Sequence, residues 1–312
     1  MDRDRHHRAA RLAIVLAIVT MAAVLVLGGC TSLGPTSRRP GVQVVAAERT
    51  WGTVAASLGG SVATVTSIVA NPAVDPHSHE PEAADARAFA DARVAIVNGL
   101  GYDTWASQLL AADSPPDRVT VDVGAVLGLP DGANPHRWYS PADVVRIASV
   151  ITGALIQAAP RDAAYLRERH GRFLHVELGA YFRTIAQIRS RHAGVPIGAS
   201  ETIVVPLAAS LGLDVLTPGA LLRAVSDGTD VSPADMATAE RQISRREIRV
   251  WVVNTQNTTP NVQVLTGMAR AAGIPVVAVT ETPDPARASF GAWQTRQLRA
   301  LAVALDHGGA DR

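Results

Sequence analysis

Two short stretches of the sequence place histidine directly after proline. Residues 75–81 read DPHSHEP and hold His77 and His79, and residues 132–141 read GANPHRWYSP and hold His136. Imidazole nitrogens, together with carboxylate oxygens, are the usual protein ligands of zinc, manganese and related divalent ions. One such turn is most often an ordinary surface turn, but two of them in one chain make metal coordination the first chemistry to consider.

A third candidate, Glu201, lies in the segment GASET at residues 198–202. Like the two histidine turns, it lies after a run of strand-forming residues and before a helical pattern. In open α/β sheets, ligands bind beyond the carboxyl ends of the strands. Three ligands at strand ends therefore predict one metal ion held between converging sheet edges.

The elements that must position these residues alternate regularly along the chain. Helical patterns separate short β-branched runs, which indicates βαβ units and parallel sheets. The expected strands are residues 42–47, 62–69, 93–99 and 118–124 in the first half, and 195–200, 213–216, 248–254 and 275–281 in the second.

Between the two sets of strands, apolar residues from Pro160 to Arg191 recur at three- and four-residue steps, which predicts a helix roughly 48 Å long. The predicted fold class is α/β, with two lobes, each a small parallel sheet flanked by helices, joined by one long backbone helix. We expect an N-terminal lobe at 41–158, the connecting helix at 159–193 and a C-terminal lobe at 194–312.

The first residues look like a targeting segment. An Arg-rich start precedes LAIVLAIVTMAAVLVLGG at residues 12–29, which carries no charge and ends in small residues before Cys30. This pattern resembles a bacterial lipobox, so we expect a lipoprotein signal peptide at 1–29, lipidation of Cys30 and a flexible tether at 30–40. A retained membrane-spanning helix is the alternative interpretation.

The composition excludes several classes of partner. All 29 basic residues are Arg, they are balanced by 28 acidic residues, and aromatic residues make up only 4% of the chain. Without a basic surface interleaved with aromatics, nucleic-acid binding is not expected. Cys30 is the only cysteine, so no internal disulfide forms.

Three segments carry a resemblance to a known family. VVAAERTWGTVAASLGG, NPAVDPHSHEPEAADARAFADARVAIVNGLGYDTW and NPHRWYSP resemble the metal-binding lipoproteins of ABC importers, the zinc/manganese solute-binding family, and the likeness extends over residues 41–305. Membership implies one divalent ion between two lobes. It places the first ligand on His77, the second on His136 and the third on Glu201.

The fourth ligand is where this chain departs from the family pattern. Many members carry a carboxylate after the strand corresponding to 248–253, but here that place reads NTQNTTP. An amide oxygen of Asn254, Gln256 or Asn257, or a water, would have to replace it. Asn257 is taken as the candidate, with Glu281 as a weaker one. Residues expected around the ligands or at the rim of the site are His79, Glu80, Trp138, Asn254, Gln256 and Glu281.

The predicted function follows from this set. The protein is expected to be a monomeric lipoprotein, anchored on the extracytoplasmic face of the cell membrane, that captures zinc first and manganese second, with iron also compatible. It would deliver the ion to an ABC permease and its ATPase. A metal-dependent surface adhesin is the alternative. A metallohydrolase is disfavoured because the chain has no HExxH or GxSxG motif.

Overall fold

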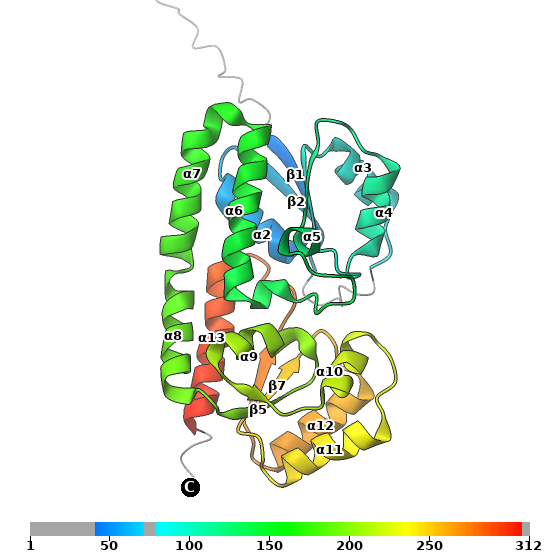
Figure 1. The fold of residues 1–312 in the computed structure, drawn as a ribbon, viewed down its shortest axis with the longest axis vertical. Coiled ribbons are helices and arrows are strands. Elements are labelled where there is room, and N and C mark those ends of the chain that lie inside the picture. Colours follow the sequence, from blue (N-terminus) through cyan, green and yellow to red (C-terminus); the bar gives the residue numbers. More distant parts are fainter. Residues whose placement is uncertain (1–40, 72–78, 308–312) are drawn as a thin grey trace, which may run out of the picture. The chain divides into compact units, whose positions relative to one another are not determined.

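A computed structural model of the chain describes residues 41–71 and 79–307 (Figure 1). From Gly41 onward the chain forms one compact unit. Four of the predictions lie outside the described residues: the signal peptide at 1–29, the lipidation of Cys30, the tether at 30–40, and the ligand His77.

The first sheet has four parallel strands in the order β2-β1-β3-β4. Its inner strand β3 is completely buried, as its run of Val, Ala and Ile requires. The strands are β1 (Val42–Glu48), β2 (Ala63–Val69), β3 (Val94–Val97) and β4 (Val119–Asp122). The helices of this lobe are α2 (Arg49–Gly59), α3 (Ala83–Asp91), α4 (Thr104–Ala112) and α5 (Val123–Leu127).

The second sheet repeats this plan, with four parallel strands in the order β6-β5-β7-β8. In both sheets the first strand of the lobe lies between the second and the third. The strands are β5 (Pro196–Ala199), β6 (Asp214–Val215), β7 (Trp251–Asn254) and β8 (Val276–Val279). The helices are α9 (Val205–Leu211), α10 (Gly219–Ser226), α11 (Pro233–Ser244) and α12 (Pro260–Ala271). Two parallel sheets flanked by helices confirm the predicted fold class.

Helix α6 (Pro141–Ala158) lies against α2, β4 and α7. It is the one helix of the described residues that has the length and hydropathy of a membrane span, and its packing is that of a core helix. After a short 3₁₀ turn, Pro160–Asp162, the connector follows as α7 (Ala163–Arg172), η4 (Phe173–Glu177) and α8 (Gly179–His192). The connector takes the predicted path, but η4 is a π-helical turn and not regular α-helix.

The last helix, α13 (Phe290–His307), packs against the connector at the π-turn. It packs along α8 and β8, contacts η4, and also contacts α2 of the first lobe. A Cβ atom on Gly291 would lie only 2.4 Å from the backbone oxygen of Glu177, so the two backbones touch at this point. The π-turn therefore lies where the backbone of α13 meets the connector.

The two lobes share one apolar core. A single hydrophobic cluster contains Trp51 and Val94 from the first lobe, Tyr181 from the connector, and Val252 and Trp293 from the second. Hydrogen bonds also cross between the lobes: the Asn134 side chain donates to the Thr202 carbonyl at 2.8 Å, and the Tyr139 hydroxyl donates to the Thr280 carbonyl at 2.9 Å. Shared packing of this kind restricts the movement of one lobe relative to the other.

The contact between α13 and η4 predicts a local sensitivity to side-chain size. Gly291→Ala adds a Cβ that meets backbone atoms, which cannot move aside as a side chain can, so we expect it to lower the free energy of unfolding by about 1–3 kcal/mol. Gly267→Ala is the control. Gly267 is solvent-exposed in the middle of α12, and an added Cβ has no atom within 4 Å. It should raise stability by about 0.5–1 kcal/mol. Urea unfolding of both variants measures the difference, and equal stabilities would contradict the close approach.

Candidate metal centre

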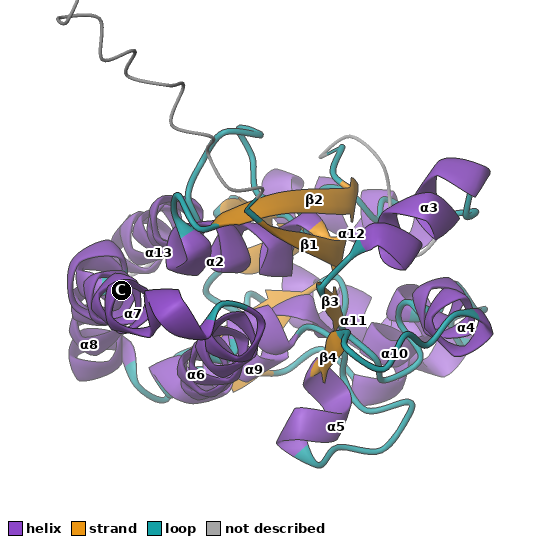
Figure 2. Cartoon of the chain, turned by 90° about the horizontal axis from the view of Figure 1, so that it is seen from above, coloured by secondary structure: helices purple, strands orange, loops and turns teal. Residues whose placement is uncertain are grey.

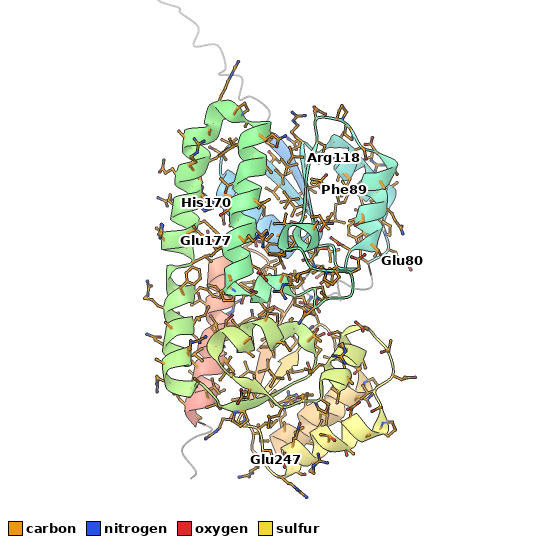
Figure 3. All side chains as sticks on the ribbon, viewed as in Figure 1. Glu80, Phe89, Arg118, His170, Glu177 and Glu247 are labelled. Carbon is orange, nitrogen blue, oxygen red and sulfur yellow. The ribbon has the colours of Figure 1, made fainter. Side chains whose placement is uncertain are left out.

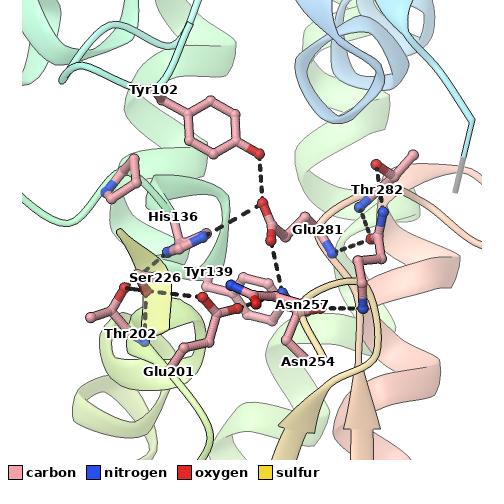
Figure 4. A network of polar contacts seen from close by, with 12 residues as sticks. Tyr102, His136, Tyr139, Glu201, Thr202, Ser226, Asn254, Asn257, Glu281 and Thr282 are labelled. Carbon is pink, nitrogen blue, oxygen red and sulfur yellow. Dashed lines mark hydrogen bonds and ion pairs between the residues drawn. The ribbon is translucent and has the colours of Figure 1, made fainter. Parts of the chain in front are cut away.

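Three ionisable side chains meet where the carboxyl ends of the two sheets face each other. His136 follows β4 in the first lobe, Glu201 follows β5, and Glu281 follows β8 in the second. One ligand atom from each lies within 4.8 Å of the other two, and the exposed fractions of the residues are 0%, 0% and 1% (Figure 4). An imidazole and two carboxylates at this spacing, away from solvent, could hold a divalent cation.

The carboxylate of Glu281 is held by donors from both lobes. Its Oε2 accepts a hydrogen bond from the hydroxyl of Tyr102 at 2.6 Å, and its Oε1 accepts one from Nδ2 of Asn254 at 2.7 Å. The backbone around it is also tied down: the hydroxyl of Thr50 donates to the Glu281 carbonyl at 2.7 Å, and the Glu281 amide donates to Oε1 of Gln256 at 2.7 Å. The oxygen atoms of this residue are therefore positioned before any metal arrives.

Glu201 is held in a similar way. Its Oε2 accepts a hydrogen bond from the hydroxyl of Ser226 at 2.9 Å, and its Oε1 accepts a short one from Nδ2 of Asn254. One amide group therefore donates to both acidic side chains of the centre, as Figure 4 shows. This neutral bridge partly offsets the repulsion between two buried carboxylates.

The ring of His136 is oriented by its neighbours. Oδ1 of Asn134 is an acceptor 3.0 Å from Nδ1 of His136, so Nδ1 carries a proton there. Nε2 then faces Glu281, 3.7 Å from its Oε2. The buried ring of Trp138 packs edge-on against the imidazole, with 5.4 Å between ring centroids. A fixed tautomer with Nε2 pointing into the centre is the arrangement that a metal-binding histidine requires.

Burial and mutual charge shift the protonation of this centre. Burial acts to lower the pKa of His136, but the nearby carboxylate of Glu281 and the negative charge of Glu201 outweigh that effect, so the pKa is raised. Burial also raises the pKa of Glu201, and the charge of Glu281 adds to this rise although His136 opposes it. A divalent cation would therefore displace protons when it binds.

A second pair of buried acids supports the histidine side of the site. Burial and the charge of Asp103 raise the pKa of Glu48 well above its ordinary value. Asp103 also accepts from the backbone amides of Asn98 and Gly99, at 2.6 and 2.8 Å. The side chain of Asn98 in turn donates to the carbonyl of Pro135, directly before His136, at 3.0 Å.

A cavity of about 980 Å³ adjoins the centre. Its lining includes four residues that hydrogen-bond directly to the three clustered side chains: Tyr102, Asn134, Thr202 and Ser226. His79 also lines it, with Nε2 at 3.0 Å from Asp85 and its ring 4.6 Å from that of Trp105. The cavity thus brings solvent up to the shell of hydrogen-bonding residues around the centre.

The structure brings together only some of the residues named from the sequence. His136 and Glu201 meet, whereas Glu80 is exposed at the surface (Figure 3). Asn257, taken as the fourth ligand, uses its amide to donate to the Val225 carbonyl at 3.0 Å. The second carboxylate of the cluster is Glu281, which the sequence offered only as the weaker candidate for the fourth ligand and as a residue of the rim.

The oxygen atoms of the other two amides are also engaged. Oδ1 of Asn254 accepts from the backbone amide of Gln256 at 3.0 Å, and Oε1 of Gln256 accepts from those of Glu281 and Thr282, at 2.7 and 2.9 Å. The segment NTQNTTP therefore positions Glu281 and bridges the carboxylates. Glu48, Tyr102 and Asp103 were not named as site residues, and the spacing of the sequence holds no signal for them.

Comparison with known proteins agrees with this fold and site. The family model of the zinc-uptake complex component A, periplasmic, matches residues 44–304. The chain therefore belongs to this family of metal-binding solute-binding proteins, which are transport components and not enzymes.

Two relatives match about half of the chain. The manganese-binding lipoprotein MntA of Halalkalibacterium halodurans is 31% identical over 156 residues, which cover 48% of this chain and 51% of MntA. The iron-binding protein YfeA of Yersinia pestis is 25% identical over 160 residues, which cover 49% of this chain and 51% of YfeA. The matched segment thus spans about half the length of each relative.

Solved structures share the fold over most of the chain. The manganese-bound periplasmic metal-binding protein from Candidatus Liberibacter asiaticus matches with a TM-score of 0.68 and 16% identity, covering 84% of this chain and 98% of that one. The solute-binding protein FpvC of Pseudomonas aeruginosa, in complex with Mn²⁺, matches with a TM-score of 0.68 and 17% identity, covering 86% and 100%.

The raised pKa values predict how the stability of the metal-free protein depends on pH. Folding raises the pKa of Glu48, Asp103, His136 and Glu201, so the folded protein keeps protons that the unfolded chain releases. Their stabilising contribution is complete below the unfolded pKa values and is lost as the pH rises through the folded ones. Each unit of pKa difference corresponds to about 1.4 kcal/mol.

We therefore expect Glu201→Gln, which keeps the side chain neutral, to lose less stability than the wild type between about pH 5 and pH 8. Denaturant unfolding in the presence of a chelator measures this. Glu247→Gln, at an exposed position, is the control and should follow the wild-type curve. If the Glu201 variant and the wild type have the same slope, the folded protein does not hold a proton at this centre.

Proposed function

We propose that this protein captures a divalent metal ion in the extracytoplasmic space and delivers it to a membrane permease driven by an ATPase. The observation that supports this most directly is the convergence of His136, Glu201 and Glu281, all buried, from the two lobes. The membership of the chain in a family of uptake-complex components supports the transport role.

The proposed ligands are His136 through Nε2, the carboxylates of Glu201 and Glu281, and His77 from the DPH turn. Two imidazoles and two carboxylates suit four-coordinate zinc, and they also suit manganese or iron when a carboxylate binds through both oxygens. Since intrinsic affinity rises along the divalent series, we propose that zinc binds more tightly than manganese to the isolated protein. The relatives named for manganese and iron support the same class of cargo.

Titration calorimetry with zinc and with manganese tests the ligand set. The wild type should bind about one equivalent, and His136→Ala and Glu281→Gln should each weaken binding by at least 100-fold, roughly the upper end of what a lost supporting residue costs. Asn257→Ala should stay within about tenfold of the wild type, because its amide donates to the Val225 carbonyl.

His175→Ala, on the exposed face of the connector, is the control for histidine removal. Wild-type affinity in both His136→Ala and Glu281→Gln would refute the site. If Asn257→Ala loses much of its metal affinity and Glu281→Gln does not, the fourth ligand is the amide of Asn257 and not Glu281. Direct competition between the two metals in the wild type tests the order of affinity.

We further propose that the protein is held at the membrane by a lipid on Cys30. The uncharged run at 12–29 and the small residues before this cysteine support the proposal. Cys30→Ser should move the protein from the membrane fraction to the soluble fraction of cells while leaving metal affinity unchanged. Continued membrane attachment of this variant would favour a retained helix instead.

A further inference from the structure

Three elements meet at a second cavity, on the α2 and α7 side of the molecule. Helix α2 contacts both α7 and α13 there, and Figure 2 views these helices from above. The cavity has a volume of about 340 Å³, and an adjoining one of about 240 Å³ shares Ser57 and Arg169 with it. Its lining includes Arg49 and Thr53 of α2, Arg169 of α7, and Arg287 and Ser289 of the loop before α13.

Within residues 41–71 and 79–307, the arginines that line this cavity and the adjoining one form no ion pair. Among the residues that the structure describes, no ion pair involves Arg49, Arg169, Arg172 or Arg287. Arg172 lines the adjoining cavity. The acidic residue there is Glu177, whose Oε1 accepts from the Gly291 amide at 3.5 Å. Several arginines therefore line these two adjoining spaces, and Glu177 is the one acidic residue among the described lining residues.

The donors of these arginines are only partly used. Nε and Nη2 of Arg169 donate to the Ser57 carbonyl, which fixes this side chain at the wall. Nε of Arg49 is buried and has no hydrogen-bond partner within the described part of the chain. A buried guanidinium nitrogen without an acceptor is costly, and an anion in the cavity would supply that acceptor.

The geometry points to a binding site for a tetrahedral oxyanion of the phosphate class, and we propose this as a second ligand site of the protein. Planar guanidinium groups match the oxygen spacing of phosphate and bind it with charge-assisted hydrogen bonds. The amino end of α13, which begins at Phe290 directly after Ser289, adds the positive end of a helix dipole. Free inorganic phosphate and the phosphodiester of a lipid headgroup share this chemistry.

The site lies beside the metal centre without being part of it. Arg49 precedes Thr50, whose hydroxyl holds the Glu281 carbonyl, and Arg287 lies on the segment that follows Glu281. None of the cavity-lining residues belongs to the metal cluster. Metal affinity is therefore an independent readout, so the loss of anion binding can be distinguished from failure of the proposed metal site.

The test is calorimetry of the full chain with inorganic phosphate against chloride at matched ionic strength. The wild type should bind about one equivalent of phosphate. Arg49→Gln and Arg287→Gln should each weaken this by about tenfold or more, because each loses a charge-assisted hydrogen bond. Arg241→Gln removes an exposed arginine from the second lobe and should bind like the wild type. All three variants should keep wild-type zinc affinity, which shows that they are folded.

Vesicles distinguish the two sources of the anion. In cosedimentation with vesicles of equal parts phosphatidylcholine and phosphatidylglycerol, a lipid ligand predicts that Arg49→Gln and Arg287→Gln bind less than the wild type, with no difference on pure phosphatidylcholine. Comparing variants on the same vesicles cancels any contribution of the N-terminal segment. Binding that depends on these arginines in either assay supports the site. If neither phosphate nor the anionic vesicles show that dependence, the proposal is overturned.

Discussion

The structure is organised around three ionisable side chains that are buried within contact distance of one another. Bringing His136, Glu201 and Glu281 out of water costs several kcal/mol for each charge unless something compensates it. Asn254 supplies part of the compensation by donating to both carboxylates, and Tyr102 and Ser226 supply more. The rest comes from protons bound to these side chains, as the raised pKa values of His136 and Glu201 indicate, or from a divalent cation that takes their place.

The need to hold these three side chains together accounts for the many contacts between the two lobes. A metal centre built from two lobes works only if the lobes hold their ligands at matching positions. The shared apolar core, the α7–η4–α8 connector, and the contacts of α13 with both α8 and α2 all limit relative movement of the lobes. Because the strand order is the same in both sheets, each lobe places the carboxyl ends of its strands towards the site.

Much of the fold could be predicted because its patterns are local. The run VAIV is buried on both faces as β3, and Ser232 caps α11 through a hydrogen bond to the Asp235 amide, as its position before Pro233 indicates. The π-turn at Phe173–Glu177 could not be predicted in this way. It occurs where the backbone of α13 touches the connector at Gly291, more than a hundred residues away, and no feature of the local sequence records that contact.

The sequence by itself indicated metal binding and identified two of the three clustered residues. His136 and Glu201 are recognisable because each follows a strand and is of a residue type that binds metals. The tertiary structure decided which residue completes the cluster. Glu281 and the amides of residues 254–257 all follow neighbouring parallel strands, so their positions in the sequence do not distinguish them. Packing decided between them: the amide groups are occupied by the backbone and by the carboxylates, whereas the carboxylate of Glu281 is turned towards His136.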